Sequence, residues 1–283
     1  VGRASGRMKT ALVQLNSSDD PVANLARTID LIAQAAGQGA GFVLTPEVTN
    51  CVSQDRAHQA AVLQHEADDI TLAGLCEVAI RKGIWLSIGS LALRTNDPDG
   101  RFANRSFLID PAGAVVACYD KIHMFDVTVS ETETYRESAG YRPGEQAVVA
   151  DTPFAKLGLS ICYDVRFAYL YRALAQAGAE VLLVPAAFSP VTGVAHWGPL
   201  LQARAIETGS YVLAAAQTGT HKATTGKSRQ TYGHSMAISP WGEVLAELGT
   251  DPGIALVDLD LRKVAQSRKR IAALSHDRPF EGP

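Results

Sequence analysis

The sequence predicts a single α/β domain in which two packed sheets are covered by helices. Apolar strand-like segments alternate with helix-like segments along the whole chain, and both crossovers and hairpins join the strands. The 283 residues have 47% hydrophobic content, which is enough to bury a sizeable core. No repeat, low-complexity tract or flexible linker divides the chain. We therefore expect one domain over 8–283, with 1–7 as an N-terminal extension or an expression remnant.

The first half of the chain shows strand patterns separated by two helices. Its strands are expected at 9–15, 41–47 and 84–90 and as a hairpin within 105–121, with a helix around 70–82. The first helix is predicted to begin with Asp20 as its N-cap and Pro21 at its first position. Its apolar face is expected to consist of Val22, Leu25, Ile29 and Ile32.

The second half begins with a long polar segment, 123–146, that shows no clear period. Loops of this length in compact domains are usually functional or disordered. The strands expected after it lie at 156–162, 180–186, 211–217, 232–239 and 253–261, and the helices at 167–177 and 196–209.

Composition and charge argue against several classes of function. The net charge of −3 does not suggest a surface that binds nucleic acid or a membrane. No apolar run approaches the ~20 residues that span a bilayer. The seven histidines and four cysteines form no metal-binding motif, and no glycine-rich nucleotide motif is present, so we expect neither a metal nor another cofactor. The cysteines are expected to be reduced thiols of a cytoplasmic protein.

Three polar residues, Glu47, Lys121 and Cys162, stand at the ends of three apolar strands. The carboxyl ends of strands are where α/β sheets gather ligands. A carboxylate can take the proton of a thiol, whose pKa of about 8.5 keeps it mostly protonated at neutral pH, and an ammonium stabilises a thiolate or an oxyanion. Each residue alone also fits a structural role, as a solvated strand end, an edge lysine or a buried thiol.

The segments around these residues resemble the nitrilase superfamily of carbon–nitrogen hydrolases. The matching motifs are LTPEV around Glu47, YDKIHMFD around Lys121 and LSICYDVRF around Cys162, and the similarity runs from about Met8 to Pro279. The resemblance implies an α/β fold of the four-layer αββα sandwich type and pairing into at least dimers. It also implies that the family's Glu–Lys–Cys triad corresponds to Glu47, Lys121 and Cys162.

The family also uses a second glutamate beyond the lysine motif. The segment YRESAGYRPG matches that part of the family and places this carboxylate at Glu137. Glu131 and Glu133 lie nearby but lack the matching Glu-Ser context. Glu137 is expected to position Lys121 or the substrate amide and to help keep the lysine protonated.

Four residues are expected to contact the substrate. The backbone N–H of Tyr163 would hold the oxyanion, and Phe188 and Thr192 would line the pocket mouth by analogy with the family. Arg166 is the first candidate to bind a substrate carboxylate, because a guanidinium binds a carboxylate through two hydrogen bonds. A structural ion pair of Arg166 with Asp164 or another acidic residue is the open alternative.

The C-terminal half resembles the branch that contains deaminated-glutathione amidases and ω-amidases, with AAAQ and YGHSM closer to the former. We therefore expect a cysteine amidohydrolase that cleaves a small carboxylated amide through a thioester and releases ammonia, as a homodimer or higher homo-oligomer. An ω-amidase, a nitrilase, an N-carbamoyl amidohydrolase and a non-catalytic assembly protein are the alternatives. The basic loop with His221, Lys222, Lys227 and Arg229 is either solvated or binds an acidic substrate. His123 and His234 are expected to be structural.

Overall fold

The computed structural model describes residues 6–131 and 133–282 and consists of two six-stranded sheets packed face to face. The first sheet has the order β16-β1-β2-β3-β4-β5. Its strands are β1 (Arg7–Gln14), β2 (Phe42–Leu44), β3 (Trp85–Leu93), β4 (Ala103–Ile109), β5 (Val115–Asp120) and β16 (Gly253–Asp260). Of the expected N-terminal extension, 1–5 lie outside the described residues, and β1 begins one residue before the expected start of the domain.

The second sheet has the order β15-β14-β11-β10-β9-β8. Its strands are β8 (Val149–Asp151), β9 (Lys156–Leu159), β10 (Val181–Leu183), β11 (Tyr211–Ala214), β14 (Met236–Ile238) and β15 (Val244–Glu247). Two small hairpins accompany the sheets, and they are formed by β6 (Asp126–Thr128) with β7 (Thr134–Arg136), and by β12 (Thr218–Thr220) with β13 (Gln230–Tyr232).

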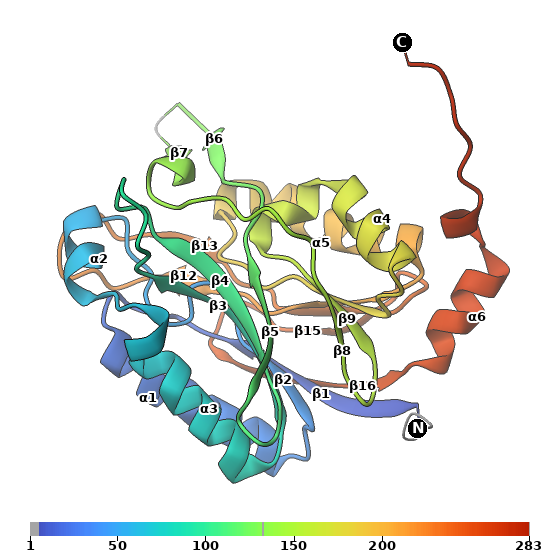
Figure 1. Ribbon diagram of the computed structural model, residues 1–283, viewed down its shortest axis with the longest axis horizontal. Coiled ribbons are helices and arrows are strands. Elements are labelled where there is room, and N and C mark those ends of the chain that lie inside the picture. The colour runs from blue at the N-terminus through green and yellow to red at the C-terminus, as the bar shows by residue number, and fades with distance from the viewer. Residues whose placement is uncertain (1–5, 132, 283) are drawn as a thin grey trace.

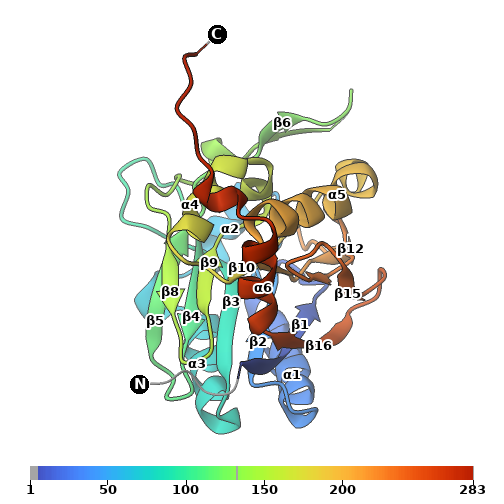
Figure 2. The ribbon, with the colours of Figure 1, turned by 90° about the vertical axis from the view of Figure 1, so that its right-hand side faces the viewer.

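Helices cover the outer face of each sheet, as Figures 1 and 2 show. The covering helices are α1 (Pro21–Gly37), α3 (Ile70–Lys82), α4 (Ala168–Gln176) and α5 (Pro190–Thr208), with α1 and α3 on the first sheet and α4 and α5 on the second. The other helical elements are α2 (Arg56–Val62), α6 (Arg262–Arg270), and the 3-10 turns η1 (Glu66–Asp68), η2 (Glu137–Ala139), η3 (Cys162–Arg166) and η4 (Ala273–Ser275). The predicted four-layer αββα sandwich is confirmed.

Side-chain alternation in the first sheet explains the layering. Leu12 and Leu44 pack towards the second sheet, whereas Val13 and Val43, their neighbours along the strands, pack under α1 and α3. Successive side chains of a strand point to opposite faces, so a strand that is buried on both faces must be apolar throughout. This is the pattern that the sequence shows.

The structure corrects three details of the predicted elements. Of the predicted apolar face of α1, Ile32 is buried and Leu25 and Ile29 pack against the core, but Val22 is 67% exposed. The fully buried residues of the helix are Asn24, Thr28, Leu31, Ile32 and Ala35. The Asn24 side chain fixes this rotation because its amide donates to the Ser18 and Asn50 carbonyls at 2.8 Å each. Helix α5 begins at Pro190, six residues earlier than predicted, and the polar segment 123–146 forms the β6–β7 hairpin and η2.

The sheet topology brings four strand ends to one edge of the sandwich. In the first sheet β2 and β3 run parallel, and two antiparallel pairings then return β5 to the same direction. In the second sheet β9 and β10 run parallel. The segments that follow β2, β5, β9 and β10 therefore meet above the sheets. None of the described helices combines the length and the apolar character needed to cross a membrane.

Candidate active site

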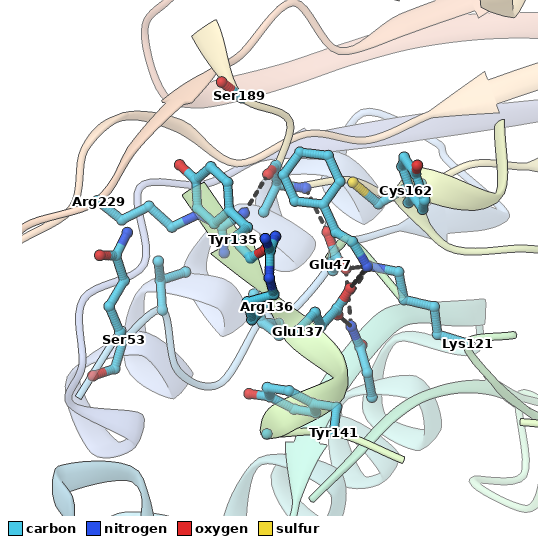
Figure 3. A pocket seen from close by; sticks show the side chains of 18 of the residues that line it. Glu47, Ser53, Lys121, Tyr135, Arg136, Glu137, Tyr141, Cys162, Ser189 and Arg229 are labelled. Atoms are coloured by element: carbon cyan, nitrogen blue, oxygen red, sulfur yellow. Dashed lines mark hydrogen bonds and ion pairs between the residues drawn. The ribbon is translucent and has the colours of Figure 1, made fainter. Parts of the chain in front are cut away.

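A cavity of about 320 Å³ lies at these strand ends, and the four predicted catalytic residues line it. Figure 3 shows Glu47, Lys121, Glu137 and Cys162 pointing towards one another inside it. Glu47 follows β2, Lys121 follows β5, Cys162 follows β9 and Glu137 begins η2. The sequence prediction that these side chains meet in one place is confirmed by their positions.

Lys121 lies between two carboxylates. Its Nζ atom is 2.8 Å from Glu47 Oε1 and 2.9 Å from Glu137 Oε2, and Glu137 Oε1 accepts a third hydrogen bond at 3.0 Å. The side chains of Lys121 and Glu47 are only 2% and 5% exposed, so water does not compete for these contacts. The ammonium is therefore held in place between the two carboxylates.

Asn104, which the sequence analysis did not identify, completes this arrangement. Its Nδ2 atom donates to Glu47 Oε1 at 2.9 Å and to Glu137 Oε1 at 3.3 Å. The residue lies in β4 beside the end of β5, and no motif marks it. We call Glu47, Asn104, Lys121, Glu137 and Cys162 the inner cluster.

Backbone donors fix the remaining carboxylate oxygens. The N–H of Ala187 donates to Glu47 Oε2 at 2.8 Å, and the N–H of Phe125 donates to Glu137 Oε2 at 2.6 Å. Since donors from the sheet edge and from the loop surround both carboxylates, neither can rotate without losing hydrogen bonds. Charge-assisted bonds of this kind are roughly twice as strong as neutral ones.

The electrostatics of the inner cluster follow from burial and from these pairs. Burial alone raises the pKa of the Glu47 carboxyl, but the positive charges of Lys121 and Arg229 outweigh it and hold this pKa below its usual value. Burial alone lowers the pKa of Lys121, but Glu137 and Glu47 hold it well above its usual value. Burial, together with the charge of Glu47, raises the pKa of the Cys162 thiol. The resting site therefore holds a carboxylate base, an ammonium and a neutral thiol.

Cys162 lies at a sharp turn between β9 and η3. Its φ of +48° is uncommon for a residue other than glycine, and its N–H donates to the Pro185 carbonyl at 2.8 Å. Residues held in such conformations cluster at functional sites because the surrounding structure must stabilise them. The turn places the thiol in the cavity beside Glu47, whose negative charge helps to raise the pKa of the thiol.

The buried Asp164 carboxylate braces this turn. Its Oδ2 accepts from the Ile161 N–H at 2.8 Å and from the Tyr119 hydroxyl at 2.7 Å, and its Oδ1 lies 2.6 Å from His123 Nδ1. Asp164 is thus engaged with β5 and with the loop after it. The alternative ion pair with Arg166 does not form, because these partners occupy the carboxylate.

A close approach between β3 and the segment after β2 holds Glu47. A Cβ atom at Gly89 would lie 2.1 Å from the Thr45 carbonyl oxygen and 2.5 Å from that of Pro46. Only glycine fits there. The next residue after Glu47, Val48, has a φ of +47°, and its N–H is held by Ser90 Oγ at 2.8 Å.

The predicted substrate contacts divide into two groups. Tyr163, Phe188 and Thr192 line the cavity, and the Thr192 hydroxyl is buried without a hydrogen-bond partner among the described residues. Arg166 does not line the cavity. Its guanidinium stacks over the rings of Tyr163 and Phe188 at 5.9 and 5.4 Å and lies 3.3 Å from His196 Nδ1. The rings of Tyr163 and Phe188 therefore lie between Arg166 and the cavity.

The remaining candidates from the sequence lie around the site. Glu133 bonds to the hydroxyls of Tyr135 and Ser189 and does not reach Lys121. His123 stacks on Phe167, whereas His234 pairs with Glu247 at 2.9 Å, and neither histidine is among the residues that line the cavity. Within 6–131 and 133–282, no group of three His, Cys, Asp or Glu side chains is arranged to hold a metal.

A second set of residues lines the cavity opposite the inner cluster. Tyr135 and Arg136 come from β7, Arg56 begins α2, and Arg229 belongs to the basic loop. Figure 3 shows Arg229 across the pocket from Lys121, with Tyr135 and Arg136 between them in the view. We call these four residues the outer wall. The sequence analysis named only Arg229 among them, as part of the basic loop.

Comparison with known proteins identifies the family. Residues 9–269 match the family model described as Carbon-nitrogen hydrolase. The chain belongs to the carbon–nitrogen hydrolase family. It is an enzyme that acts on C–N amide bonds, and its inner cluster is the candidate site of that chemistry.

Several relatives place this carbon–nitrogen hydrolase among the amidases of the nitrilase superfamily. The chain is 39% identical to a deaminated glutathione amidase of Yersinia enterocolitica over 95% of its own length and 92% of the relative's. It resembles the structure of Saccharomyces cerevisiae Nit3, a member of branch 10 of the nitrilase superfamily, with a TM-score of 0.83, 28% identity and 99% coverage of both chains.

An amidase from Nesterenkonia sp. AN1 also matches, with a TM-score of 0.76, 31% identity, and coverage of 94% of this chain and 98% of that one. In that structure of a mutant enzyme, acrylamide has added to the active-site cysteine.

Proposed function

We propose that this enzyme is a cysteine amidase that hydrolyses a carboxylated amide through a thioester on Cys162. The observation that carries the proposal is the inner cluster, in which a carboxylate with a lowered pKa and a buried thiol line the same cavity beside an ammonium. A binding scaffold has no need for a base, an ammonium and a thiol in one cavity. This argues against the alternative of a non-catalytic assembly protein.

In the acylation step, Glu47 takes the Cys162 proton as the sulfur attacks the amide carbon. Because the thiol is neutral at rest, proton transfer accompanies the attack. The negative charge that develops on the carbonyl oxygen is stabilised by Lys121 and by the N–H of Tyr163, which has no acceptor among the described residues. One such donor typically contributes about 2.7–4 kcal/mol to the barrier. The C–N bond then breaks, and Glu47 delivers its proton to the leaving amine.

In the deacylation step, Glu47 removes a proton from water, and the resulting hydroxide attacks the thioester. The C–S bond breaks, the acid product leaves, and the proton returns to the Cys162 sulfur. Glu137 holds the Lys121 ammonium in both steps, with Asn104 aligning the two carboxylates. Thr192 and Phe188 line the pocket, and Arg166, which stacks on the rings of Tyr163 and Phe188, is proposed to bind a substrate carboxylate that extends past these rings.

Among substrates, deaminated glutathione is favoured, because it is named for the Yersinia enterocolitica relative. This compound contains secondary amides and no primary amide, so its cleavage releases a peptide amine instead of ammonia. The expected release of ammonia belongs to the ω-amidase alternative, whose substrates are primary amides. Whether the enzyme releases an amine or ammonia therefore distinguishes a deaminated glutathione amidase from an ω-amidase.

The test is to incubate the purified enzyme with deaminated glutathione, α-ketoglutaramate, succinamate, a carbamoyl-amino acid and a nitrile. Product analysis follows amine and ammonia separately, and intact-protein mass spectrometry after acid quenching detects the acyl adduct on Cys162. We expect the fastest turnover with deaminated glutathione and an adduct that is lost when Cys162 is replaced. Turnover without an adduct on Cys162, or no turnover of any amide, contradicts the proposal.

We also propose that the enzyme is a cytoplasmic homodimer. The four cysteines are free thiols, as expected for a reducing compartment. Exposed apolar side chains on α4 and α5, including Tyr169, Val191 and Val194 at 66%, 53% and 77%, support pairing through this surface. Light scattering on the purified enzyme tests the dimer, and Val194→Asp should shift it to a monomer.

A further inference from the structure

Three arginines of the outer wall face the cavity without a carboxylate partner. Arg56, Arg136 and Arg229 line it, and none forms an ion pair with a described residue. Elsewhere the chain does pair its arginines, since Arg105 and Arg142 both bind Asp120. Arg136 acts on Asp126 and Arg229 on Glu47 at longer range, but neither forms a direct ion pair among the described residues. Three guanidinium groups without a direct ion pair on one cavity wall repel one another, so their clustering favours an anionic ligand.

Arg229 is anchored but incompletely satisfied. Its Nη2 donates to the Ala187 carbonyl at 2.7 Å, and the guanidinium stacks over the Tyr135 ring at 5.7 Å. Its Nε is buried and has no hydrogen-bond partner. A buried donor without an acceptor is costly, by about 1–3 kcal/mol. A ligand oxygen in the cavity would remove that cost.

The position of Arg56 depends on a glycine. The guanidinium stacks over the Phe102 ring at 4.8 Å, and a Cβ atom at Gly140 would lie 1.8 Å from Arg56 Nη1. The chain thus leaves room for a guanidinium at the cavity wall by having no side chain at residue 140. Arg136 immediately precedes Glu137, and its Nη1 donates only to the neighbouring Tyr135 carbonyl.

The charges divide the cavity into two ends. The inner cluster contains two carboxylates, Glu47 and Glu137, and one ammonium, Lys121, so its net charge is −1. The three arginines of the outer wall carry three positive charges. An amide with an anionic group distant from its scissile bond is therefore oriented with the amide towards Cys162.

We infer that Arg56, Arg136 and Arg229 form a second anionic subsite, which selects amides carrying a further carboxylate beyond the one assigned to Arg166. The inference rests on the proposed amidase function and specifies its substrate class as amides with two carboxylates. The subsite acts on binding, because its guanidinium groups bind a carboxylate that does not take part in the reaction.

The experiment measures binding without turnover, by calorimetry on the Cys162→Ala protein. The two probes are deaminated glutathione, with two carboxylates, and the same compound with its glycine carboxylate converted to a carboxamide. Arg56→Gln, Arg136→Gln, Arg229→Gln and Gly140→Ala are each added to the Cys162→Ala protein. Arg262→Gln, which breaks an exposed pair with Asp260 at the end of β16, is the matched control. Melting temperatures confirm that each variant is folded.

We expect the dicarboxylate to bind at least about ten-fold more tightly than the carboxamide, as hydrogen bonds to charged groups predict. The arginine variants and Gly140→Ala should reduce this ratio, mainly by weakening the dicarboxylate, and Arg262→Gln should leave it unchanged. Equal affinities for the two probes, no binding of either, or variants that weaken both equally overturn the inference. Failure of the proposed function is distinct: the intact enzyme would then form no adduct on Cys162, whatever the ratio measured on the alanine variant.

Discussion

The inner cluster and the outer wall line the same cavity but are built in opposite ways. The inner cluster is buried at strand ends, and each of its charges is paired and hydrogen-bonded. The outer wall comes from a hairpin, a loop and the start of a short helix, and its arginines form no direct ion pair within the part of the chain that the structure describes. Rigid paired charges suit bond making and breaking, whereas unpaired charges suit the capture of a ligand that brings the opposite charge.

This difference predicts that changes in the two regions affect different kinetic constants. Substitutions in the inner cluster should lower kcat with little effect on binding, because its groups act mainly on the transition state. Substitutions around the mouth and the outer wall should mainly raise KM. Replacing Arg229 should also raise the pKa of Glu47, which its charge helps to lower.

The largest effect is expected for Cys162→Ala. Removing the nucleophile should lower turnover by at least about 10⁴-fold, as in other enzymes that act through covalent intermediates. The substitution removes only the thiol group, and Asp164 still holds the turn, so the melting temperature should change little. Steady-state assays and calorimetric melting check both points. Residual turnover above this level would show that water reaches the amide without the thioester.

A smaller loss is expected for Glu137→Gln. The change keeps the shape but removes one of the two negative charges that hold Lys121. Positioning groups of this kind contribute about 10²- to 10⁴-fold, so the single-turnover acylation rate should fall within that range while KM stays near wild type. A rate within a few-fold of wild type would remove Glu137 from the inner cluster's chemistry.

Arg166→Lys tests the mouth of the pocket. Lysine keeps the charge but lacks the planar guanidinium that binds both oxygens of a carboxylate. KM for a carboxylated amide should therefore rise by about ten-fold, with kcat nearly unchanged. If the melting temperature falls and KM does not change, Arg166 only braces the rings of Tyr163 and Phe188.

The smallest effect concerns pH. The pKa of Glu47 is lowered from 4.5, so its base form is present above that value and is lost only as the pH falls through the lowered pKa. The raised pKa of Cys162 keeps the thiol protonated up to at least pH 8. Between about pH 5.5 and 8, kcat/KM should therefore change less than about two-fold. An acid limb near neutral pH would mean that burial outweighs the Lys121 charge at Glu47.

The inner cluster was largely predictable from the sequence, and the outer wall was not. Glu47, Lys121 and Cys162 directly follow apolar strands, so a local pattern indicates both their element and their shared edge. The α/β layering follows from apolar segments buried on both faces. Asn104 lies in β4 among ordinary strand residues, and nothing local distinguishes it.

The outer wall depends on contacts that sequence periodicity does not encode. Arg56 lies at the cavity because Gly140, far along the chain, leaves room for it. Arg229 is placed by a hydrogen bond to Ala187. The exposure of Val22 has a similar cause, since the side-chain hydrogen bonds of Asn24 fix a rotation of α1 that leaves Val22 outside the buried face.

The pairing of β1 with β16 has a consequence for the order of assembly during synthesis. Eight residue pairs, from Arg7 with Asp260 to Gln14 with Gly253, join the two ends of the chain in one sheet. Until β16 has been synthesised, β1 has no neighbour on that side and exposes its edge. The strand beside the Glu47-bearing β2 is therefore covered only after β16 follows, and the first sheet cannot be completed before then.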